Sequence, residues 1–127
     1  MKKLTPNQII QLHSQLISTS GGTDGVRDIG LVESAVANVF ETYFGVDQYP
    51  TIEEKSARLC YSLIKNHGFI DGNKRIGIFA MLVLLEVNGI VLQCTDEELV
   101  KLGIGVASSD LEYEDILEFI KKTLMNT

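Results

Sequence analysis

The chain has 127 residues, 45% of them hydrophobic and 22% charged, which is typical of a globular domain and argues against a disordered protein. Its formal net charge is −6, and because an acidic surface repels phosphate backbones, direct nucleic-acid binding is disfavoured. The longest apolar stretch, residues 76–87, contains Glu86 and is too short to span a bilayer, so no membrane segment is expected.

Targeting and redox features of the sequence agree with this composition. Pro6, Asn7 and Gln8 interrupt the N-terminal sequence before an apolar run long enough for a secretion signal can form. Cys60 and Cys94 belong to no CxxC pair and lie beside apolar residues, which favours two reduced, mostly buried thiols. We therefore expect a cytoplasmic protein whose residues 1–127 form a single domain.

Helix-start signals divide the chain into segments. In a capping box, a Ser or Thr at the N-cap and a Glu or Gln three residues later each satisfy a free backbone N–H. This pattern occurs at residues 5–8, 51–54, 95–98 and 109–112, and Asp28 is a further plausible N-cap. These signals predict that helices begin shortly after each of these positions.

Apolar residues recur at helical spacing after these signals. The first helix is expected to stop at the Gly21-Gly22 pair, and the second to carry the apolar residues between 31 and 40. The remaining helices are expected over about 52–66, from about 73 to a stop at Asn88-Gly89, over about 96–104 and over about 110–124. We place His13 on the surface of the first helix.

The helix that starts near residue 73 is apolar almost all round, which is typical of a helix buried at the centre of a protein. The predicted architecture is therefore all-α, with about six helices around one buried central helix. Short extended pieces are expected within residues 43–50 and over residues 90–93.

A dense group of polar side chains lies between two of the apolar helices. It consists of His67, Asp71, Asn73, Lys74 and Arg75. We interpret this segment as a loop that leads into a helix N-terminus, where free N–H groups and the helix dipole favour an anion, above all phosphate.

The basic residues at this helix start need an explanation. A cation in the first turn opposes the helix dipole at a cost of roughly 0.3–1 kcal/mol, so Lys74 and Arg75 fit best if an anion lies between them and the helix end. Gly72 would let the backbone turn tightly and approach such a ligand closely. The alternative to a phosphate site is that both cations are solvated or paired with surface acids.

Asp71 and His67 each allow two interpretations. Asp71 can be a simple capping carboxylate or, beside a phosphate site, a ligand for Mg²⁺ that the ion shares with substrate phosphates. His67 can be structural, or a general base that takes a proton from an attacking hydroxyl. Phe69 is expected to be a core anchor that fixes the loop. The residues alone therefore point no further than nucleotide-dependent transfer to a hydroxyl.

The string HGFIDGNKR, residues 67–75, resembles the signature of the Fic/Doc family, HxFx(D/E/N)(G/A)N(G/K)R, at every defined position. The stretch GGTDGVRDIGLVESAV at residues 21–36, the helix before His67 and the LLEVNGI that ends at Ile90 are similar to the death-on-curing (Doc) branch of that family. The resemblance covers nearly the whole chain.

This resemblance implies an all-α Fic fold that uses ATP and Mg²⁺. His67 would deprotonate a target hydroxyl, and Asp71 would bind Mg²⁺. The ATP phosphates would be held by the loop backbone together with Gly72, Asn73, Lys74 and Arg75. The loop at residues 43–50 falls where the family has a flap that docks the target segment.

Two departures from AMP-transferring relatives bear on the reaction. Those enzymes resemble HxFx(D/E)GNGRxxR, whereas this chain has Lys74 in place of the second glycine and Ile78 in place of the second arginine. Both changes match Doc-type toxins, which are understood to bind ATP reversed, transfer its γ-phosphoryl group to a threonine of elongation factor Tu and halt translation. The resemblance thus implies a protein kinase toxin neutralised by a cognate Phd-like antitoxin. A Fic-type AMP-transferase and a catalytically inactive binding module are the alternatives.

Arg27 and Asp28 lie at the expected start of the second helix. We expect a local ion pair between them. A contact from these residues to the nucleotide or to the antitoxin is the alternative.

Overall fold

The computed structural model describes residues 1–124. Within this range the chain folds into helices and one short hairpin: α1 (Pro6–Ser20), α2 (Ile29–Phe40), β1 (Thr42–Tyr43), β2 (Val46–Asp47), α3 (Ile52–Asn66), α4 (Asn73–Val87), α5 (Asp96–Ala107) and α6 (Tyr113–Thr123). The predicted all-α architecture is confirmed. Across the described residues, no helix is both long and apolar enough to cross a membrane.

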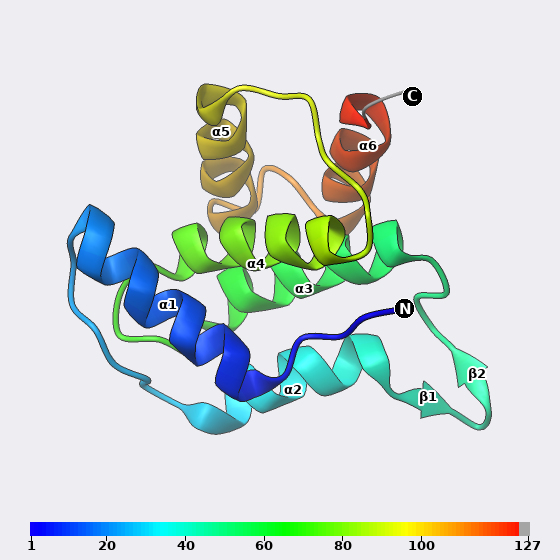
Figure 1. Ribbon diagram of the computed structural model, residues 1–127, viewed down its shortest axis with the longest axis horizontal. Helices are drawn as coiled ribbons and strands as arrows, with labels where there is room; N and C mark the ends of the chain where they lie inside the picture. The colour runs from blue at the N-terminus through cyan, green and yellow to red at the C-terminus, as the bar shows by residue number, and fades with distance from the viewer. Residues whose placement is uncertain (125–127) are drawn as a thin grey trace.

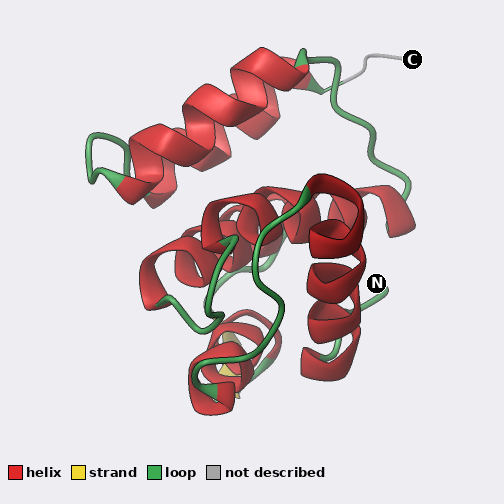
Figure 2. Cartoon of the chain, turned by 90° about the vertical axis from the view of Figure 1, so that its left-hand side faces the viewer, coloured by secondary structure: helices red, strands yellow, loops and turns green. Residues whose placement is uncertain are grey.

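The helices are arranged around α3 and α4, which pack against each other in the middle of the molecule (Figure 1). α1 and α2 cover one side of this pair, and α5 and α6 cover the other. Figure 2 shows how little of the chain is strand beside the helices and their connecting loops. The predicted central position of α4 is confirmed, and α3 shares that position.

Two clusters of buried apolar side chains lie on the two sides of the α3–α4 pair. The cluster toward α1 and α2 contains, among others, Ile9, Val36, Leu63 and Ile76. The cluster toward α5 and α6 contains, among others, Met81, Leu102, Ile116 and Ile120. Because each cluster draws residues from both central helices, packing on either side fixes the relative position of α3 and α4.

A glycine lets α3 and α4 approach each other closely. A Cβ atom at Gly77 would lie 2.5 Å from Cγ1 of Ile64 and 3.0 Å from the carbonyl oxygen of Cys60. A larger residue would therefore force the helices apart or shift their side chains. This contact holds the start of α4 against the end of α3, and so it fixes both ends of the loop between them.

Most of the predicted helix starts are confirmed. Complete capping boxes occur at residues 5–8 and 95–98, and Asp28 caps α2. Thr51 accepts the N–H of Glu54, but the Glu54 carboxylate accepts from the Thr51 hydroxyl instead of the Thr51 backbone. This start is therefore capped by half of the expected pattern.

The capping box predicted at residues 109–112 is wrong. Ser109 lies in a turn with a left-handed φ of 66°, and Glu112 is the N-cap, with its N–H donating to the carboxylate of Asp115 at 2.8 Å. α6 consequently begins at Tyr113 rather than near residue 110. α5 continues to Ala107, about one turn beyond the predicted end.

The brief strand predicted over residues 90–93 is also wrong, because this segment makes only an isolated bridge between Leu92 and Leu124. The extended piece predicted within residues 43–50 is confirmed by β1 and β2. They are joined through Phe44 and Gly45, with φ values of 53° and 75° that match a tight type I′ hairpin turn.

Both cysteines are free, as expected. Cys60 is buried between the central helices, and burial raises the pKa of its thiol. Cys94 is half-buried, and burial together with the charges of Glu98 and Asp96 raises its pKa as well. Since the thiolate is the reactive form, both side chains are poor nucleophiles in this fold.

Candidate active site

The loop between α3 and α4, residues 67–72, has left-handed backbone at both ends. His67 ends α3 with φ 53° and ψ 48°, and Gly72 precedes α4 with φ 76°. Glycine adopts this conformation without cost, whereas a histidine in it is uncommon. His67 is therefore held in place by the structure around it.

Backbone hydrogen bonds tie this loop to the segment between α1 and α2. The N–H groups of Arg27 and Asp28 donate to the carbonyl of Gly68 at 2.8 and 3.0 Å, and the N–H of Ile70 donates to the carbonyl of Gly25 at 3.1 Å. The glycine-rich segment thus acts as a backbone support for the loop.

Asn73 closes the loop on itself. Its side-chain oxygen accepts the N–H of Phe69 and its side-chain nitrogen donates to the carbonyl of Phe69, both at 3.0 Å. The ring of Phe69 is buried in the cluster beside α1 and α2, with 1% of its surface exposed. The prediction that Phe69 anchors the loop is confirmed. The two hydrogen bonds of Asn73 connect the backbone of Phe69 to the start of α4.

Asp71 is oriented from two sides. Its Oδ2 accepts the N–H of Thr23 at 3.0 Å, and its Oδ1 accepts the N–H of Gly72 at 2.8 Å. The bond from Thr23, then that from Gly72, holds the pKa of the Asp71 carboxyl below its ordinary value, and the nearby charge of Arg75 acts in the same direction. Gly72 occupies the N-cap of α4 without a side-chain cap, so Asp71 is not the capping residue.

The donor set around Asp71 fits a magnesium ion shared with a nucleotide. In the part of the chain that the structure describes, no three His, Cys, Asp or Glu side chains are grouped to enclose a metal. Mg²⁺ is commonly held by one or two carboxylates together with substrate phosphates, not by a protein cage. The Asp71 side chain is 46% exposed, which leaves it accessible for such a shared site.

A cavity of about 430 Å³ opens where the loop meets α4. Its lining is His67, Ile70, Asp71, Gly72, Asn73, Lys74, Arg75 and Ala107. The N–H of Ile76 makes the first α-helical bond, to the carbonyl of Gly72, so the N–H groups of residues 73–75 precede the regular ladder. The structure therefore brings all six predicted site residues together at a helix N-terminus suited to an anion.

The two cations of this cavity differ in their surroundings. Lys74 is exposed and forms no ion pair within residues 1–124. Arg75 donates from Nη1 to Oγ of Ser20 at 2.8 Å and to the carbonyl of Gly21 at 2.7 Å, and its Nη2 lies 3.8 Å from Asp71. Arg75 thus joins α1 to the loop, while Lys74 is available to a ligand.

The side chain of His67 is exposed and lines the same cavity. The backbone carbonyl of His67 accepts from Nε of Arg27 at 2.7 Å. Nη2 of Arg27 donates to the backbone carbonyl of Asn66 at 3.3 Å. A guanidinium at the C-terminus of α3 satisfies carbonyls that lack helical partners. The imidazole of His67, which could accept a proton, is therefore solvent-accessible, while the backbone of His67 is fixed.

Arg27 and Asp28 do not form the ion pair predicted for them among the described residues. Arg27 instead caps the end of α3, and Asp28 accepts the N–H of Gly30 at 3.0 Å to cap α2. Both residues act on the backbone around the site.

The predicted surface position of His13 is wrong. The residue is buried on α1, with 1% of its surface exposed. Its Nε2 donates to the carbonyl oxygen of Asp71 at 2.6 Å, and its ring stacks on Phe69 with a centroid distance of 4.0 Å. Its Nδ1 lies 3.4 Å from a carboxylate oxygen of Asp24. His13 therefore supports the loop from the buried face of α1.

A signal for His13 was present in the sequence. It lies four residues from both Ile9 and Ile17, and all three belong to the buried face of α1. Residues at this spacing share one side of a helix. A histidine in an apolar stripe indicates a buried polar group with a partner elsewhere, but spacing does not identify that partner.

The hairpin β1–β2 lies at the opposite end of α3 from the loop that contains His67 (Figure 1). α3 has 15 residues, which corresponds to a length of roughly 22 Å. The position expected for a family flap is thus occupied by a hairpin separated from His67 by the length of this helix.

Comparison with known proteins places these features in context. The model of the Fic/DOC family matches residues 3–85, which include the loop and most of α4. Toxin Doc of Mycolicibacterium smegmatis is 46% identical over 72 residues, covering 57% of this chain and 55% of that protein, about half of its length. Protein kinase doc of Escherichia phage P1 is 28% identical over 123 residues, covering 96% of this chain and 95% of that protein.

Proposed function

The chain belongs to the Fic/Doc family, and from this premise we propose that it is the toxin of a type II toxin–antitoxin system. Its activity would be that of a Doc-like protein kinase, which transfers the γ-phosphoryl group of ATP to a Thr or Ser hydroxyl of a translation factor. The observation that carries the proposal is the cavity in which exposed His67 and Lys74 meet the N-terminus of α4.

His67 is the general base of this reaction. Its exposed imidazole takes the proton from the accepting hydroxyl, whose oxygen then bonds to the γ-phosphorus as the bond to the β–γ bridging oxygen breaks and ADP leaves. The left-handed backbone conformation and the hydrogen bond from Arg27 fix the backbone position from which the His67 side chain extends. Positioning of this kind is a large part of catalysis in phosphoryl transfer.

The start of α4 holds the ATP phosphates. The N–H groups of residues 73–75 and the ammonium of Lys74 supply positive potential, and Gly72 lets the backbone come close. Asp71 and the phosphates would hold Mg²⁺, which when bound neutralises charge that develops on the transferring group. Arg75 contacts both Asp71 and Ser20 at the end of α1, and so holds the loop and α1 in a fixed relative position for this binding.

Transfer of a phosphoryl rather than an adenylyl group is supported by the residues that replace the AMP-transferase pattern. Lys74 lines the cavity at the position of the second glycine, so its stem takes up space there. Ile78 replaces the second arginine and lines an apolar groove instead. The relative named Protein kinase doc is aligned over 96% of this chain.

We propose elongation factor Tu as the target, which would place the toxin in the cytoplasm, and a Phd-like antitoxin as the neutralising partner. An apolar groove of about 340 Å³ beside Lys74 suits a segment of the antitoxin that folds on binding. Its apolar walls come from α1, α4 and α5 and include Leu16, Phe79, Leu82, Leu99, Val100 and Ile104.

Intact-mass spectrometry tests the reaction. Purified chain is incubated with Mg·ATP and elongation factor Tu, and the expected product is heavier by one phosphoryl group. An adenylyl increment would instead support the AMP-transferase, and an unmodified target would refute elongation factor Tu as the substrate. Expression in a sensitive host separates catalysis from mere binding, because growth arrest that survives His67→Ala would contradict a catalytic toxin.

A further inference from the structure

A second cavity, of about 280 Å³, lies between α2 and α3. The polar residues of this α2–α3 trough are Ser34, Asn38, Tyr43, Arg58, Ser62 and Asn66. The residues from α2 are one helical turn apart, and so are successive residues from α3, which makes two facing polar stripes. Asn66, the last residue of α3 in this lining, immediately precedes His67, so the trough runs along the helix that ends at the candidate active site.

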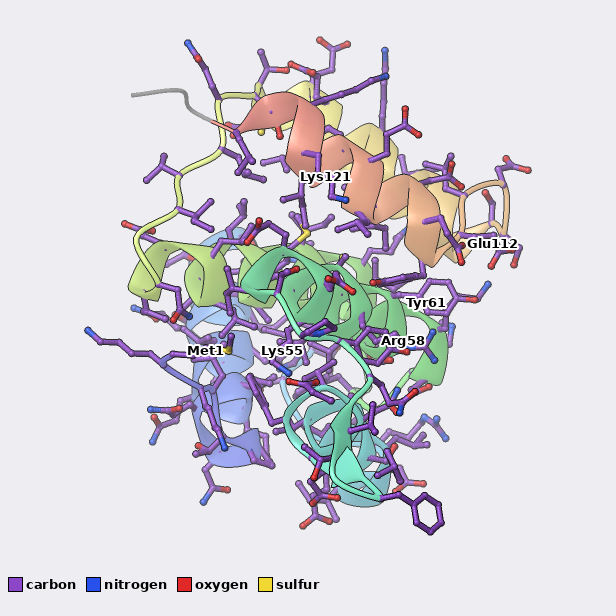
Figure 3. All side chains as sticks on the ribbon, turned by 90° about the vertical axis from the view of Figure 1, so that its right-hand side faces the viewer. Met1, Lys55, Arg58, Tyr61, Glu112 and Lys121 are labelled. Carbon is purple, nitrogen blue, oxygen red and sulfur yellow. The ribbon has the colours of Figure 1, made fainter. Side chains whose placement is uncertain are left out.

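Arg58 is the cation of this trough. Within residues 1–124 it forms no ion pair, and its Nε is buried without a hydrogen-bond partner. Its guanidinium carbon lies 5.8 Å from the ring centroid of Tyr49 and 5.1 Å from that of Tyr61. Figure 3 shows Arg58 and Tyr61 close together, with Tyr61 on the side toward Glu112. The rings attract the cation but offer no countercharge and no acceptor in the plane of its N–H groups.

This arrangement is unusual for so acidic a chain. The sequence has 17 acidic residues against 11 basic ones, yet none of the described residues that line the trough is acidic. A buried N–H without a partner costs about 1–3 kcal/mol, and native proteins contain few such groups. A ligand in the trough cannot reach the covered Nε, but a negatively charged one would supply the countercharge that the guanidinium lacks.

We propose that Arg58 binds a carboxylate side chain of the protein segment that carries the accepting hydroxyl. This inference rests on the proposed transfer at His67, because the trough matters only if a protein segment reaches that residue. The planar fork of a guanidinium matches the two oxygens of a carboxylate. The hydroxyl and amide groups of the two polar stripes can pair with the backbone of the same segment.

The spacing of the two sites defines the sequence that would be selected. α3 rises about 1.5 Å per residue, so Arg58 lies about 13 Å along the helix from His67. An extended segment advances about 3.3 Å per residue, and the same distance therefore corresponds to about four residues. The trough selects substrates with Asp or Glu about four residues from the accepting Ser or Thr.

Binding is tested with peptides on the 127-residue His67→Ala chain, a substitution that prevents turnover. Fluorescein-labelled peptides carry a central Thr and a Glu four residues before or after it, and matched peptides carry Gln in the same place. We expect one Glu peptide to bind at least about fivefold more tightly than its Gln partner. Arg58→Gln should remove this difference, whereas Lys121→Gln, the same charge change at an exposed position of α6 (Figure 3), should retain it.

A charge exchange distinguishes recognition from a structural role. Arg58→Glu should prefer a peptide with Lys in place of Glu, and thermal unfolding of each variant reports whether it is folded. Equal binding of Glu and Gln peptides by the parent chain, or an equal loss for both in folded Arg58→Gln, overturns the proposal. Phosphorylation by the wild-type chain is measured separately, so absent transfer refutes the kinase while the binding preference still decides the role of Arg58.

Discussion

Nε2 of His13 lies 2.6 Å from the carbonyl oxygen of Asp71, and this bond joins the buried face of α1 to the loop that precedes α4. The same ring stacks on Phe69, which Asn73 ties to the start of α4. The proposed magnesium ligand is therefore positioned through a side chain distant from it in the sequence. His13 acts on Asp71 through the backbone and touches no reacting atom.

Replacing His13 tests this support. His13→Phe keeps a ring against Phe69 but leaves the Asp71 carbonyl without its donor, which should cost about 1–3 kcal/mol of stability. The KM for Mg·ATP should rise in this variant. In His13→Gln, whose side-chain amide can donate to the same carbonyl, the increase in KM should be smaller. Urea unfolding and steady-state kinetics measure these effects.

A core variant provides the control for His13. Ile120→Val removes a buried methyl group on the far side of α3 and α4 and should cost about 0.5–1.5 kcal/mol without changing the KM. If both variants raise the KM in proportion to their loss of stability, His13 has no specific effect on the loop.

Asp71→Asn tests the metal ligand. The amide oxygen can still accept from Thr23, but the amide NH2 cannot accept the N–H of Gly72, and the side chain loses the negative charge that attracts Mg²⁺. Affinity for Mg·ATP measured by calorimetry should fall by at least about tenfold. In EDTA the variant should bind ATP at least as tightly as the wild type, because its side chain no longer repels the phosphates, and weaker binding without magnesium would argue for a role in loop structure instead.

Much of the fold was predictable because local signals and packing agree. Thr5 and Thr95 are followed by partners that complete capping boxes, and α3 has its predicted bounds. Ser109 has the same local pattern, yet Glu112 and Asp115 form the competing cap, and a spacing rule cannot rank two overlapping caps.

The candidate site was predictable where it is contiguous in the sequence. His67 to Arg75 lie in one string, and the cavity gathers its members. The roles of His13 and Arg58 could not be predicted in the same way, because each role depends on contacts with other parts of the fold that are distant in the sequence. The strand predicted over residues 90–93 failed since an apolar segment forms a ladder only with a neighbouring strand.

Gly77→Ala tests the close approach of the central helices. The new methyl group would meet Ile64 and the carbonyl of Cys60, and such overpacking should cost about 1–3 kcal/mol although alanine favours helix. Gly89→Ala is a matched comparison with open space around it, where the strain of φ 84° is the main effect. Calorimetric unfolding of both variants measures the loss, and a more stable Gly77→Ala chain would contradict the packing described.

Stability in acid should depend on the pair between Lys55 and Asp47. Nζ of buried Lys55 donates to both oxygens of Asp47 and to the carbonyl of Val39, each at 2.8 Å. The Lys55 bond, then the N–H of Tyr49, holds the pKa of Asp47 below its ordinary value of 3.8.

Because the folded pKa is the lower one, this contribution is fully present above the ordinary value and is lost as the pH falls through the folded pKa. Asp47→Asn should therefore lower the urea midpoint near neutral pH and lose less further stability in acid than the wild type does. Urea titrations across this range measure both slopes. Parallel curves for the two chains would show that the pair does not contribute to acid unfolding.

A crystal structure of the His67→Ala chain with Mg·ATP tests the central claim most directly. It should place the nucleotide phosphates against the N–H groups of residues 73–75 and the ammonium of Lys74, with Mg²⁺ between Asp71 and the phosphates and the γ-phosphate facing position 67. Nucleotide bound elsewhere, or no nucleotide at this helix end at saturating concentration, would contradict a phosphoryl-transfer site here.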